Sequence, residues 1–555
     1  MKRKFDLAFT GGGISTTYTL VHFLESLEEA HQTAVGYKVP AAISIVVIER
    51  YEHLFTGIPY GKASTETALI ITPLRDFLPE TEKHEFIVWL EANQDRLMRR
   101  HCVSIQTGDP LLRNIISEWY TENAAAVNSN QWDDLCVPRR WFGEYITERV
   151  KKAISRCTDL DLINFETIRA EVVGVTRSSQ DNFELSLREN DGQISELISK
   201  HLVLAIGSPP RCKIEPFLEA VDAAYRNDFS LIEDVYSPDF SSSLERISNQ
   251  HSEGKDIERK NVLIVGSNAS ALEVIYHLRS DLDRISELLI LSPDASLPML
   301  IGPVQKDITV PSVNVDLLRE AADKGILTAE QLYIAIAEDT ANAKVAGYNI
   351  SDINAQVSRI MAGYLAQLSL EEQLVYFERY GMKTTRMMRR AAKEYRLPLD
   401  DLMTKGKLKL IAGRYKSMFT DNTGNLGVLY HDTDRKEIKL DASHISVIVN
   451  CTGSEPLNQT SSSVINSLVS AGLAKVTGNL LGLVVNDAFE ACENLFVMGP
   501  LLAGNINKAI NSWHVESAGR ISLLAQPLAL RLRERLFPNE LPLVNQGSAS
   551  YKKVL

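Results

Sequence analysis

The sequence contains the same strand–turn–helix pattern twice, once at the N-terminus and once near the middle of the chain. Residues 5–10 form a short apolar run typical of a buried strand, three glycines follow, and apolar residues then recur at helical spacing over 14–30. Another apolar run follows at 43–48. The same order of elements occurs again near the middle of the chain: an apolar run at 261–265, a turn of small residues, a helical stretch and an apolar run at 288–291. This order opens a dinucleotide-binding βαβ unit, so the sequence predicts an α/β protein with two Rossmann-like domains.

The first turn has the composition needed to hold a pyrophosphate. Gly11 permits a tight turn, Gly13 lets the backbone approach the phosphates, and the following helix presents its positive N-terminal end. Thr16 replaces the third glycine of the usual fingerprint and is still small enough for close helix packing. Glu49 ends the next strand, where an acidic side chain accepts hydrogen bonds from ribose hydroxyls. We therefore expect cofactor contacts from Gly11, Gly12, Gly13, Ile14, Ser15 and Glu49.

The second turn keeps only one glycine, and serine, asparagine and alanine fill the other positions. The residues expected to contact a second dinucleotide are Gly266, Ser267, Asn268, Ala269 and Ser270. A degenerate dinucleotide site and a purely structural turn both fit this sequence. An NADPH-specific site usually places Arg or Lys after the next strand, but residues 291–294 contain neither. The choice between NADH and NADPH is therefore open.

Composition narrows the classes of function. The chain has 555 residues, a formal net charge of −12 and 45% apolar residues. These values suit large globular cores and argue against nucleic acid as a partner. No run approaches the roughly 18 apolar residues of a membrane span, and the apolar run at the N-terminus is too short for a signal peptide, so we expect a cytoplasmic protein without a membrane partner. The six cysteines form no CxxC pair, so neither a dithiol redox centre nor a metal site is expected.

Changes of pattern along the chain predict its division into parts. The stretch 310–405 is almost wholly helical and predicts an insert, and apolar periodicity over 506–536 predicts one long closing helix. The polar, serine-rich stretch 239–260 predicts a linker. The expected parts are a first dinucleotide-binding domain over 1–240, a second over 261–450 that carries the insert, a return to the first domain over 451–537 and a tail over 538–555.

Further motifs give the chain a family resemblance. They are GIPYG at 57–61, PRRWFGEYI at 138–146, LAIGSPP at 204–210, NCTG at 450–453 and FVMGP at 496–500. Together with GGGIS in the first turn, they make most of the chain similar to flavoproteins with two dinucleotide-binding domains. Within these it resembles bacterial FAD/NAD(P)-binding proteins related to N-hydroxylating and class B flavin monooxygenases, including aspartate N-hydroxylase-like enzymes.

The resemblance implies FAD in the first domain and its return segment, and NAD(P)H in the second domain. Cofactor contacts are also expected from Arg50, Arg139, Val173, Gly207 and Gly499. Arg139 is preferred over Arg140 because the arginine of the family motif directly follows the proline. A permanently charged guanidinium there would help to balance the charge of the FAD pyrophosphate.

The activity that the resemblance implies is that of an FAD-dependent, NAD(P)H-using monooxygenase, similar to N-hydroxylases, acting on a small molecule. In such an enzyme the cofactor carries the chemistry and the protein supplies orientation and a dry pocket, so no catalytic residue is assigned. The alternatives are a non-oxygenating FAD dehydrogenase or reductase, and a flavin-bound sensor or partner-binding protein without turnover. His514 and Glu516 fit either a structural pair or a catalytic one. The basic face of Arg386, Arg389 and Arg390 fits either a solvated surface or an anion site.

Overall fold

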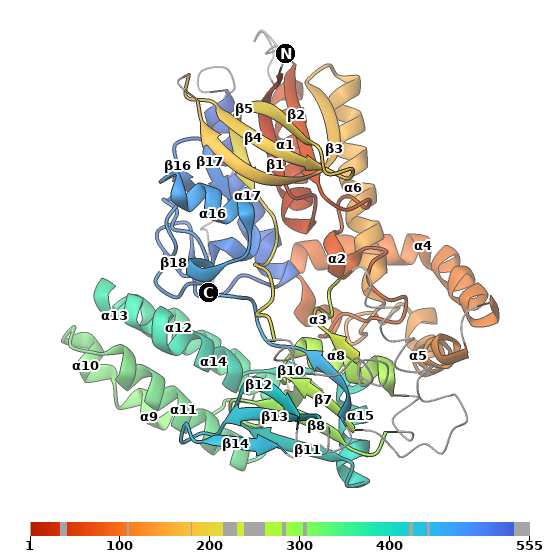
Figure 1. Cartoon of the computed structure of the whole chain (residues 1–555), viewed down its shortest axis with the longest axis vertical. Coiled ribbons are helices and arrows are strands. Elements are labelled where there is room, and N and C mark those ends of the chain that lie inside the picture. The colour runs from red at the N-terminus through yellow and green to blue at the C-terminus, as the bar shows by residue number, and fades with distance from the viewer. Residues whose placement is uncertain are drawn as a thin grey trace.

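The computed structural model contains two large sheets, one mixed and one wholly parallel, which lie at opposite ends of the molecule in Figure 1. The residues that it describes are 2–33, 42–107, 110–178, 180–214, 230–237, 261–279, 285–303, 308–420, 426–440 and 445–537. The predicted tail and the predicted linker lie outside these residues. Within the described part of the chain, none of the helices combines the length and the hydrophobicity that a bilayer span requires.

The first sheet follows directly from the first βαβ pattern. Its strands are β1 (Arg3–Thr10), β2 (Ile43–Glu49), β3 (Ile163–Arg177), β4 (Phe183–Glu189), β5 (Ile194–Leu204), β16 (Glu490–Cys492) and β17 (Leu495–Val497). Strand β1 lies in the centre and pairs in parallel with β2 and β5, and β2 continues in parallel to β3. The outer halves of β3 and β5 extend into an antiparallel meander with β4. Strand β17 joins β5 in parallel, so a late segment of the chain adds a strand to the first sheet.

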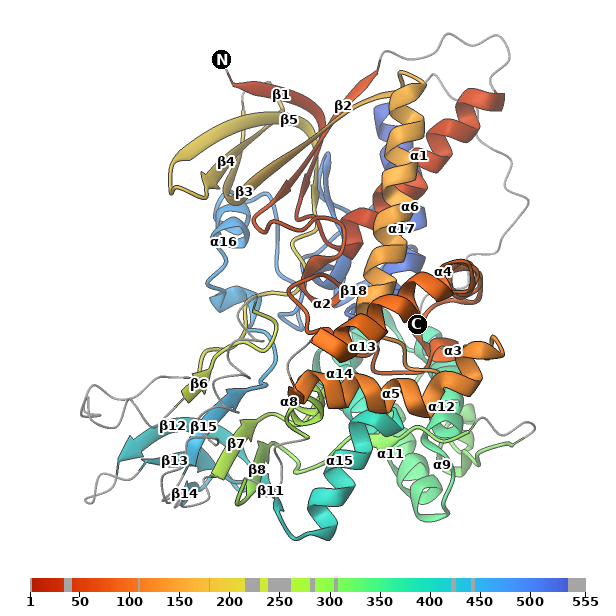
Figure 2. The same ribbon diagram turned by 90° about the vertical axis from the view of Figure 1, so that its right-hand side faces the viewer.

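Three long helices lie side by side next to this sheet in Figure 2: α1 (Ile14–Thr33), α6 (Arg139–Asp159) and α17 (Ala518–Leu536). The prediction of one helix over 506–536 is wrong, because the helix begins only at Ala518, where the Ser517 side chain caps it by accepting from the Arg520 amide. The preceding residues form a short hairpin of β18 (Asn505–Ile506) and β19 (Asn511–Ser512).

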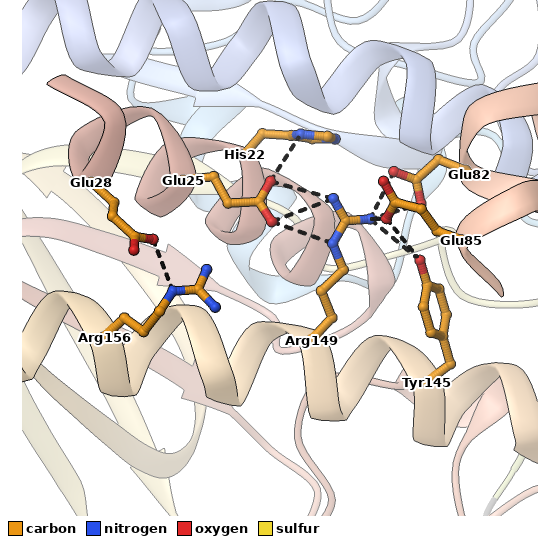
Figure 3. Close-up of polar contacts among 8 residues, drawn as sticks. All are labelled: His22, Glu25, Glu28, Glu82, Glu85, Tyr145, Arg149 and Arg156. Atoms are coloured by element: carbon orange, nitrogen blue, oxygen red, sulfur yellow. Dashed lines mark hydrogen bonds and ion pairs between the residues drawn. The ribbon is translucent and has the colours of Figure 1, made fainter. Parts of the chain in front are cut away.

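A cluster of ionised side chains joins α1, α6 and helix α4 (Glu80–Thr107), as Figure 3 shows. Arg149 on α6 contacts Glu82 and Glu85 of α4 at 2.8 Å and Glu25 of α1 at 3.3 Å. Burial raises the pKa of Glu82, although Arg149 opposes the shift. Burial and the Arg149 charge lower the pKa of His22 to about 4. One half-buried cation therefore holds these three helices together.

The second sheet is wholly parallel, with the order β11-β8-β7-β15-β6. Its strands are β6 (Ser230–Ile232), β7 (Asn261–Val265), β8 (Leu288–Ser292), β11 (Leu408–Ala412) and β15 (Ile445–Asn450). Alternate residues of β7 face two cores: Val262 and Ile264 belong to the main core, and Leu263 and Val265 belong to a separate one. Burial on both faces explains why these strands read as unbroken apolar runs. Strand β6 belongs to this second sheet although it precedes residue 240.

The helical insert follows β8 and has its own hydrophobic core. Its helices are α9 (Val313–Asp316), α10 (Arg319–Asp323), α11 (Ala329–Val345), α12 (Ile350–Tyr364), α13 (Leu370–Val375) and α14 (Gly381–Met387). Helix α15 (Lys393–Thr404) then leads back to β11 and packs on α8 (Ala269–Leu278). The remaining helices are α2 (Gly57–Tyr60), α3 (Leu74–Phe77), α5 (Pro110–Asn128) and α16 (Ser463–Ser470). The remaining strands are the pair β9 (Met299–Leu300) and β10 (Arg390–Ala391), and the meander β12 (Arg414–Thr420), β13 (Leu426–His431) and β14 (Glu437–Leu440).

Candidate functional site

The first glycine turn connects β1 to α1 and is held by the two neighbouring strands. The Gly11 amide donates to the Ile48 carbonyl at 2.8 Å. The Ala205 amide donates to the Thr10 carbonyl at 2.9 Å. Gly11 has a φ of +92°, and a Cβ at this position would lie 2.4 Å from the Ala205 oxygen. Glycine is therefore required here, because any side chain would strain the backbone and collide with the neighbouring strand.

The second glycine turn repeats this construction. The Gly266 amide donates to the Leu291 carbonyl at 2.8 Å. The Cys451 amide donates to the Val265 carbonyl, also at 2.8 Å. Gly266 has a φ of +113°, and a Cβ there would lie 2.2 Å from the Cys451 oxygen. The LAIG and NCTG motifs thus do the same thing in the two units, since each places the backbone of a neighbouring strand against the first glycine of a turn.

Segments from three parts of the sequence meet at the N-terminus of α1. Gly13 lies against Gly57 of the GIPYG motif, where a Cβ on Gly13 would be 3.6 Å from the Gly57 Cα. Gly499 lies against Ser15, where a Cβ would be 2.3 Å from the Ser15 hydroxyl oxygen. The first amides of a helix have no partner within the helix. These small residues therefore form a cradle around the positive end of α1, which fits the pyrophosphate of FAD.

Glu49 lies beside the first turn, as its place at the end of β2 predicts. Its Oε2 accepts from the Gly12 amide at 2.7 Å, and its Oε1 accepts from the Tyr51 amide at 3.0 Å. The neighbouring Arg50 is exposed; its guanidinium lies over the Tyr51 ring and 4.0 Å from Glu171. The structure thus brings the Glu49 carboxylate to the turn and leaves Arg50 at the surface.

Two other predicted cofactor contacts lie on the first sheet and just beyond it. Gly207 follows β5 with a φ of +83°, and a Cβ there would meet no atom within 4 Å, so the space beside it is open. Val173 is half-buried in β3, at the irregularity where the register with β4 shifts between Val172 and Gly174. Contacts of Gly207 and Val173 with FAD remain predictions.

The GIPYG motif lies in a segment, residues 54–71, that runs from the first turn to the second unit. We call it the bridging segment. The Phe55 carbonyl accepts from the Thr17 hydroxyl of α1 at 2.9 Å. Farther along, the hydroxyls of Thr65 and Thr67 each lie 2.9 Å from one ring nitrogen of His277 on α8. Burial, together with the charges of Arg139 and Arg279, lowers the pKa of His277 to about 3. A neutral, buried histidine therefore anchors the bridging segment to the helix that follows the second turn.

Arg139 has a partner different from the one expected for it. Its guanidinium forms an ion pair with Glu273 on α8, and both side chains are buried. Arg140 contacts the middle of the bridging segment, where it donates to the carbonyls of Lys62 and Ser64. The two arginines thus have different partners. Arg139 joins the two units through protein contacts, and its contact with FAD remains a prediction.

Two of the three arginines of the insert, Arg389 and Arg390, are not on a solvated face, whereas Arg386 is exposed. Arg389 donates from Nη1 to the Ser267 hydroxyl at 3.2 Å, and therefore reaches the second turn. Arg390 lies 3.6 Å from Asp76 of the first unit. Their side chains are only 11% and 19% exposed. The Arg389 Nε donates to the Arg386 carbonyl at 3.3 Å, and this bond helps to hold the Arg389 guanidinium in place.

A cavity of about 270 Å³ lies where the insert, the second turn and the return segment meet. Its lining includes Asn268 and Ala269 of the turn, Ile71, Trp513, and three arginines, Arg389, Arg390 and Arg520. The N-terminus of α8 borders the same space, and Arg520 reaches it from the first turn of α17. Helix N-termini and guanidinium groups both carry positive charge, so the cavity suits an anionic ligand.

His514 lies between Arg520 and Glu516 at the edge of this cavity. The Arg520 Nη1 donates to His514 Nδ1 at 3.0 Å and to the His514 carbonyl at 2.6 Å. Because Nδ1 accepts, the proton of the neutral ring lies on Nε2, which donates to Glu516 Oε2 at 3.2 Å. Among the described residues, no carboxylate lies within 4.0 Å of Arg520. The pair predicted from the sequence is thus part of a chain that begins at Arg520.

Comparisons with known proteins agree with this geometry. A family model described as FAD-NAD(P)-binding matches residues 8–209. The uncharacterized protein Rv3403c of Mycobacterium tuberculosis is 31% identical over 540 residues, which cover 96% of each chain, and Mb3437c of Mycobacterium bovis gives the same values. The chain belongs to the family of Rv3403c. Its predicted FAD/NAD(P)-binding character is confirmed by the family model.

Solved structures confirm the fold that the resemblance implies for this member of the Rv3403c family. The FAD-bound cadaverine monooxygenase DfoA from Erwinia amylovora superimposes with a TM-score of 0.53 at 14% identity, covering 98% of this chain and 96% of that one. The ornithine N-hydroxylase KtzI from Kutzneria sp. 744 gives 0.50 at 12% identity, covering 96% and 99%. The fold is therefore that of N-hydroxylating flavin monooxygenases.

Sequence reasoning missed four residues that shape the site: Glu273, His277, Trp513 and Arg520. Glu273 and His277 are one helical turn apart on α8, a spacing that could have marked them as one polar stripe inside an apolar helix. Arg520 lay inside the incorrectly extended closing helix. Recognising Ser517 as an N-cap would have placed Arg520 in the first turn, where a cation is unfavourable unless an anion is near.

Proposed function

We propose that this protein is an FAD-dependent, NAD(P)H-using oxidoreductase, and specifically a monooxygenase of the N-hydroxylase type that acts on a small molecule. The observation that carries the proposal is the identical construction of the two glycine turns, one in each sheet. Such a turn holds the pyrophosphate of a dinucleotide. Two of them in one chain, linked by the bridging segment, fit one dinucleotide as a bound cofactor and a second as the electron donor.

Different residues bind the two dinucleotides. At the first turn, the amides that follow Gly11 bind the FAD pyrophosphate, and the Glu49 carboxylate accepts from the ribose hydroxyls. At the second turn, the amides that follow Gly266 bind NAD(P)H in the same way. FAD supplies hydride acceptance and oxygen activation when bound. The bridging segment and the Arg139–Glu273 ion pair hold the two units together, which orients the two dinucleotides.

The part of the cavity lined by Arg520 and Trp513 supports a small substrate that carries an anionic group, beside the turn residues Asn268 and Ala269 that we assign to NAD(P)H. Arg520 faces the cavity without a carboxylate within 4.0 Å among the described residues, although buried cations are normally paired. Trp513 and Ile71 give the cavity apolar walls that exclude water, which favours oxygenation over loss of the activated oxygen to water.

The domain division and the cellular location are also proposals, which rest on the two sheets and on the cysteines. The sheets favour a first unit that ends before β6 and resumes after β15, with the insert between β8 and α15. The described cysteines form no disulfides, which fits the reducing cytoplasm.

Oxygen transfer separates the monooxygenase from the other two functions. The FAD-loaded protein is supplied with NADPH, ¹⁸O₂ and a set of small amines that each carry an anionic group, and the products are analysed by mass spectrometry. We expect one ¹⁸O atom in an N-hydroxylated product and the other in water, with one NADPH oxidised per product. A reductase oxidises NADPH and passes the electrons to a dye without labelling any product. A sensor does not oxidise NADPH, and either of these two results contradicts the proposal.

A further inference from the structure

The loop that follows β8 lacks the cation that usually recognises NADPH, yet the structure places one there from elsewhere in the chain. In a dinucleotide-binding unit, the adenosine ribose lies between the glycine turn and the end of the second strand. In this unit those two places are Ser267 in the turn and residues 293–296 after β8. A residue that selects NADPH has to present positive charge between them.

Arg389 of the insert spans this gap. From Nη1 it donates to the Ser267 hydroxyl at 3.2 Å, and from Nη2 it donates to the Ser296 hydroxyl at 2.6 Å. Its guanidinium is also 3.6 Å from the Asp294 carboxylate. The side chain is 11% exposed, whereas that of Asp294 is 46% exposed. The arginine is therefore held by hydroxyl groups on both sides of the gap, and its acidic neighbour is free to turn towards solvent.

Arg389 lies among other cations. Burial lowers its pKa, the Asp294 carboxylate opposes this shift, and Arg386 acts in the same direction as burial. Lys344 lies in the same neighbourhood, because the Arg389 charge contributes to lowering its pKa. Among the described residues, Asp294 is the one carboxylate within 4.0 Å of Arg389. Arg389 thus lies near two other cations, and its one close carboxylate is 46% exposed, so a further anion is favourable beside it.

We propose that Arg389 binds the 2′-phosphate of NADPH and makes the protein select NADPH over NADH. The inference rests on the proposed function, since it requires a dinucleotide at the second turn. The planar fork of arginine suits a phosphate, and the two serine hydroxyls add further donors. Asp294 acts in the opposite direction, because an acidic group after the second strand accepts from the 2′-hydroxyl of NADH and repels a phosphate. The insert thus supplies a specificity that the β8 loop lacks.

Binding of oxidised nucleotides tests the proposal without turnover. The FAD-loaded protein is titrated by calorimetry with NADP⁺, with NAD⁺ and with adenosine 2′,5′-bisphosphate. We expect NADP⁺ to bind more tightly than NAD⁺. Arg389→Met should weaken NADP⁺ and the bisphosphate by about ten- to a hundredfold and leave NAD⁺ nearly unchanged. Asp294→Asn should tighten NADP⁺. Arg379→Met, which removes an exposed charge from the same insert, is the matched control and should change neither nucleotide.

Two results would overturn the proposal: equal weakening of NADP⁺ and NAD⁺ in Arg389→Met, and wild-type protein that binds NAD⁺ as tightly as NADP⁺. Unchanged FAD content and circular dichroism in the variant ensure that a loss reflects the contact and not unfolding. Selective NADP⁺ binding that depends on Arg389, in a protein whose flavin NADPH does not reduce, would support this inference and contradict the proposed function. Reduction by NADPH and NADH alike, with no preference in binding, would do the reverse.

Discussion

Removing the positive charge of Arg139 is expected to destabilise the protein strongly, and removing Glu273 as well is expected to restore most of the loss. The Arg139 and Glu273 side chains are 8% and 7% exposed. Arg139→Met therefore leaves a buried carboxylate whose nearest base is His277, with 3.9 Å between Oε1 and Nε2. Breaking a buried pair in this way costs about 3–5 kcal/mol, whereas replacing both partners by apolar residues is often neutral. An exposed pair such as Arg96 with Glu144 contributes less than about 1 kcal/mol, so Arg96→Met is the matched control.

Urea unfolding followed by tryptophan fluorescence measures these free energies in the two single variants, the double variant and the control. We expect the Arg139→Met, Glu273→Met double variant to be more stable than either single variant. A double variant that is less stable than both would refute the ion-pair reasoning. FAD titration of the same proteins separates the two roles of Arg139. A direct contact with FAD predicts weaker binding in Arg139→Met and in the double variant alike, whereas the ion pair predicts recovery in the double variant.

Three other predictions follow from the geometry. Gly266→Ala places a Cβ 2.2 Å from the Cys451 oxygen, so flavin reduction by NADPH should slow while bound FAD is retained; unchanged kinetics in stopped-flow would contradict this. Arg149→Met leaves three neighbouring glutamates without their cation and should lower the free energy of unfolding by about 3–5 kcal/mol, measured in urea; a loss below 1 kcal/mol would argue against the cluster. The pKa values of His22 and His277 are about 4 and about 3 in the folded protein, below the usual 6.5. The unfolded chain therefore binds protons first, and stability should fall as the pH drops below 6.5, by about 1.4 kcal/mol per pH unit for each histidine. His277→Gln should reduce this slope, and an unchanged slope would count against its burial as a neutral base.

The two turns could be predicted from the sequence because their signals are local. Gly11 and Gly266 stand between an apolar strand and a helical period, and a positive φ at such a place requires glycine whatever surrounds it. The parallel strands were equally visible, since burial on both faces leaves an unbroken apolar run. Local chemistry thus predicted the fold class, the two turns and the position of Glu49.

The rest of the site arises from contacts between residues that are far apart in the chain. The contact of Arg389 with Ser267 joins residues 122 positions apart, and the pair of Arg139 with Glu273 joins residues 134 apart. The local sequence around each arginine does not indicate which residue it contacts, so a guanidinium expected at FAD could equally meet a carboxylate. The closing helix was predicted too long because the apolar residues of the hairpin before Ala518 happen to continue the helical period.

Anaerobic reduction of the flavin tests the central claim most directly. The FAD-loaded protein is mixed with NADPH under nitrogen in a stopped-flow instrument, and the flavin absorbance is recorded. Hydride transfer between two dinucleotides held at the two turns predicts complete loss of the absorbance with one equivalent of NADPH, and its return when air is admitted. A protein that keeps its FAD but is reduced by neither NADPH nor NADH would contradict the account.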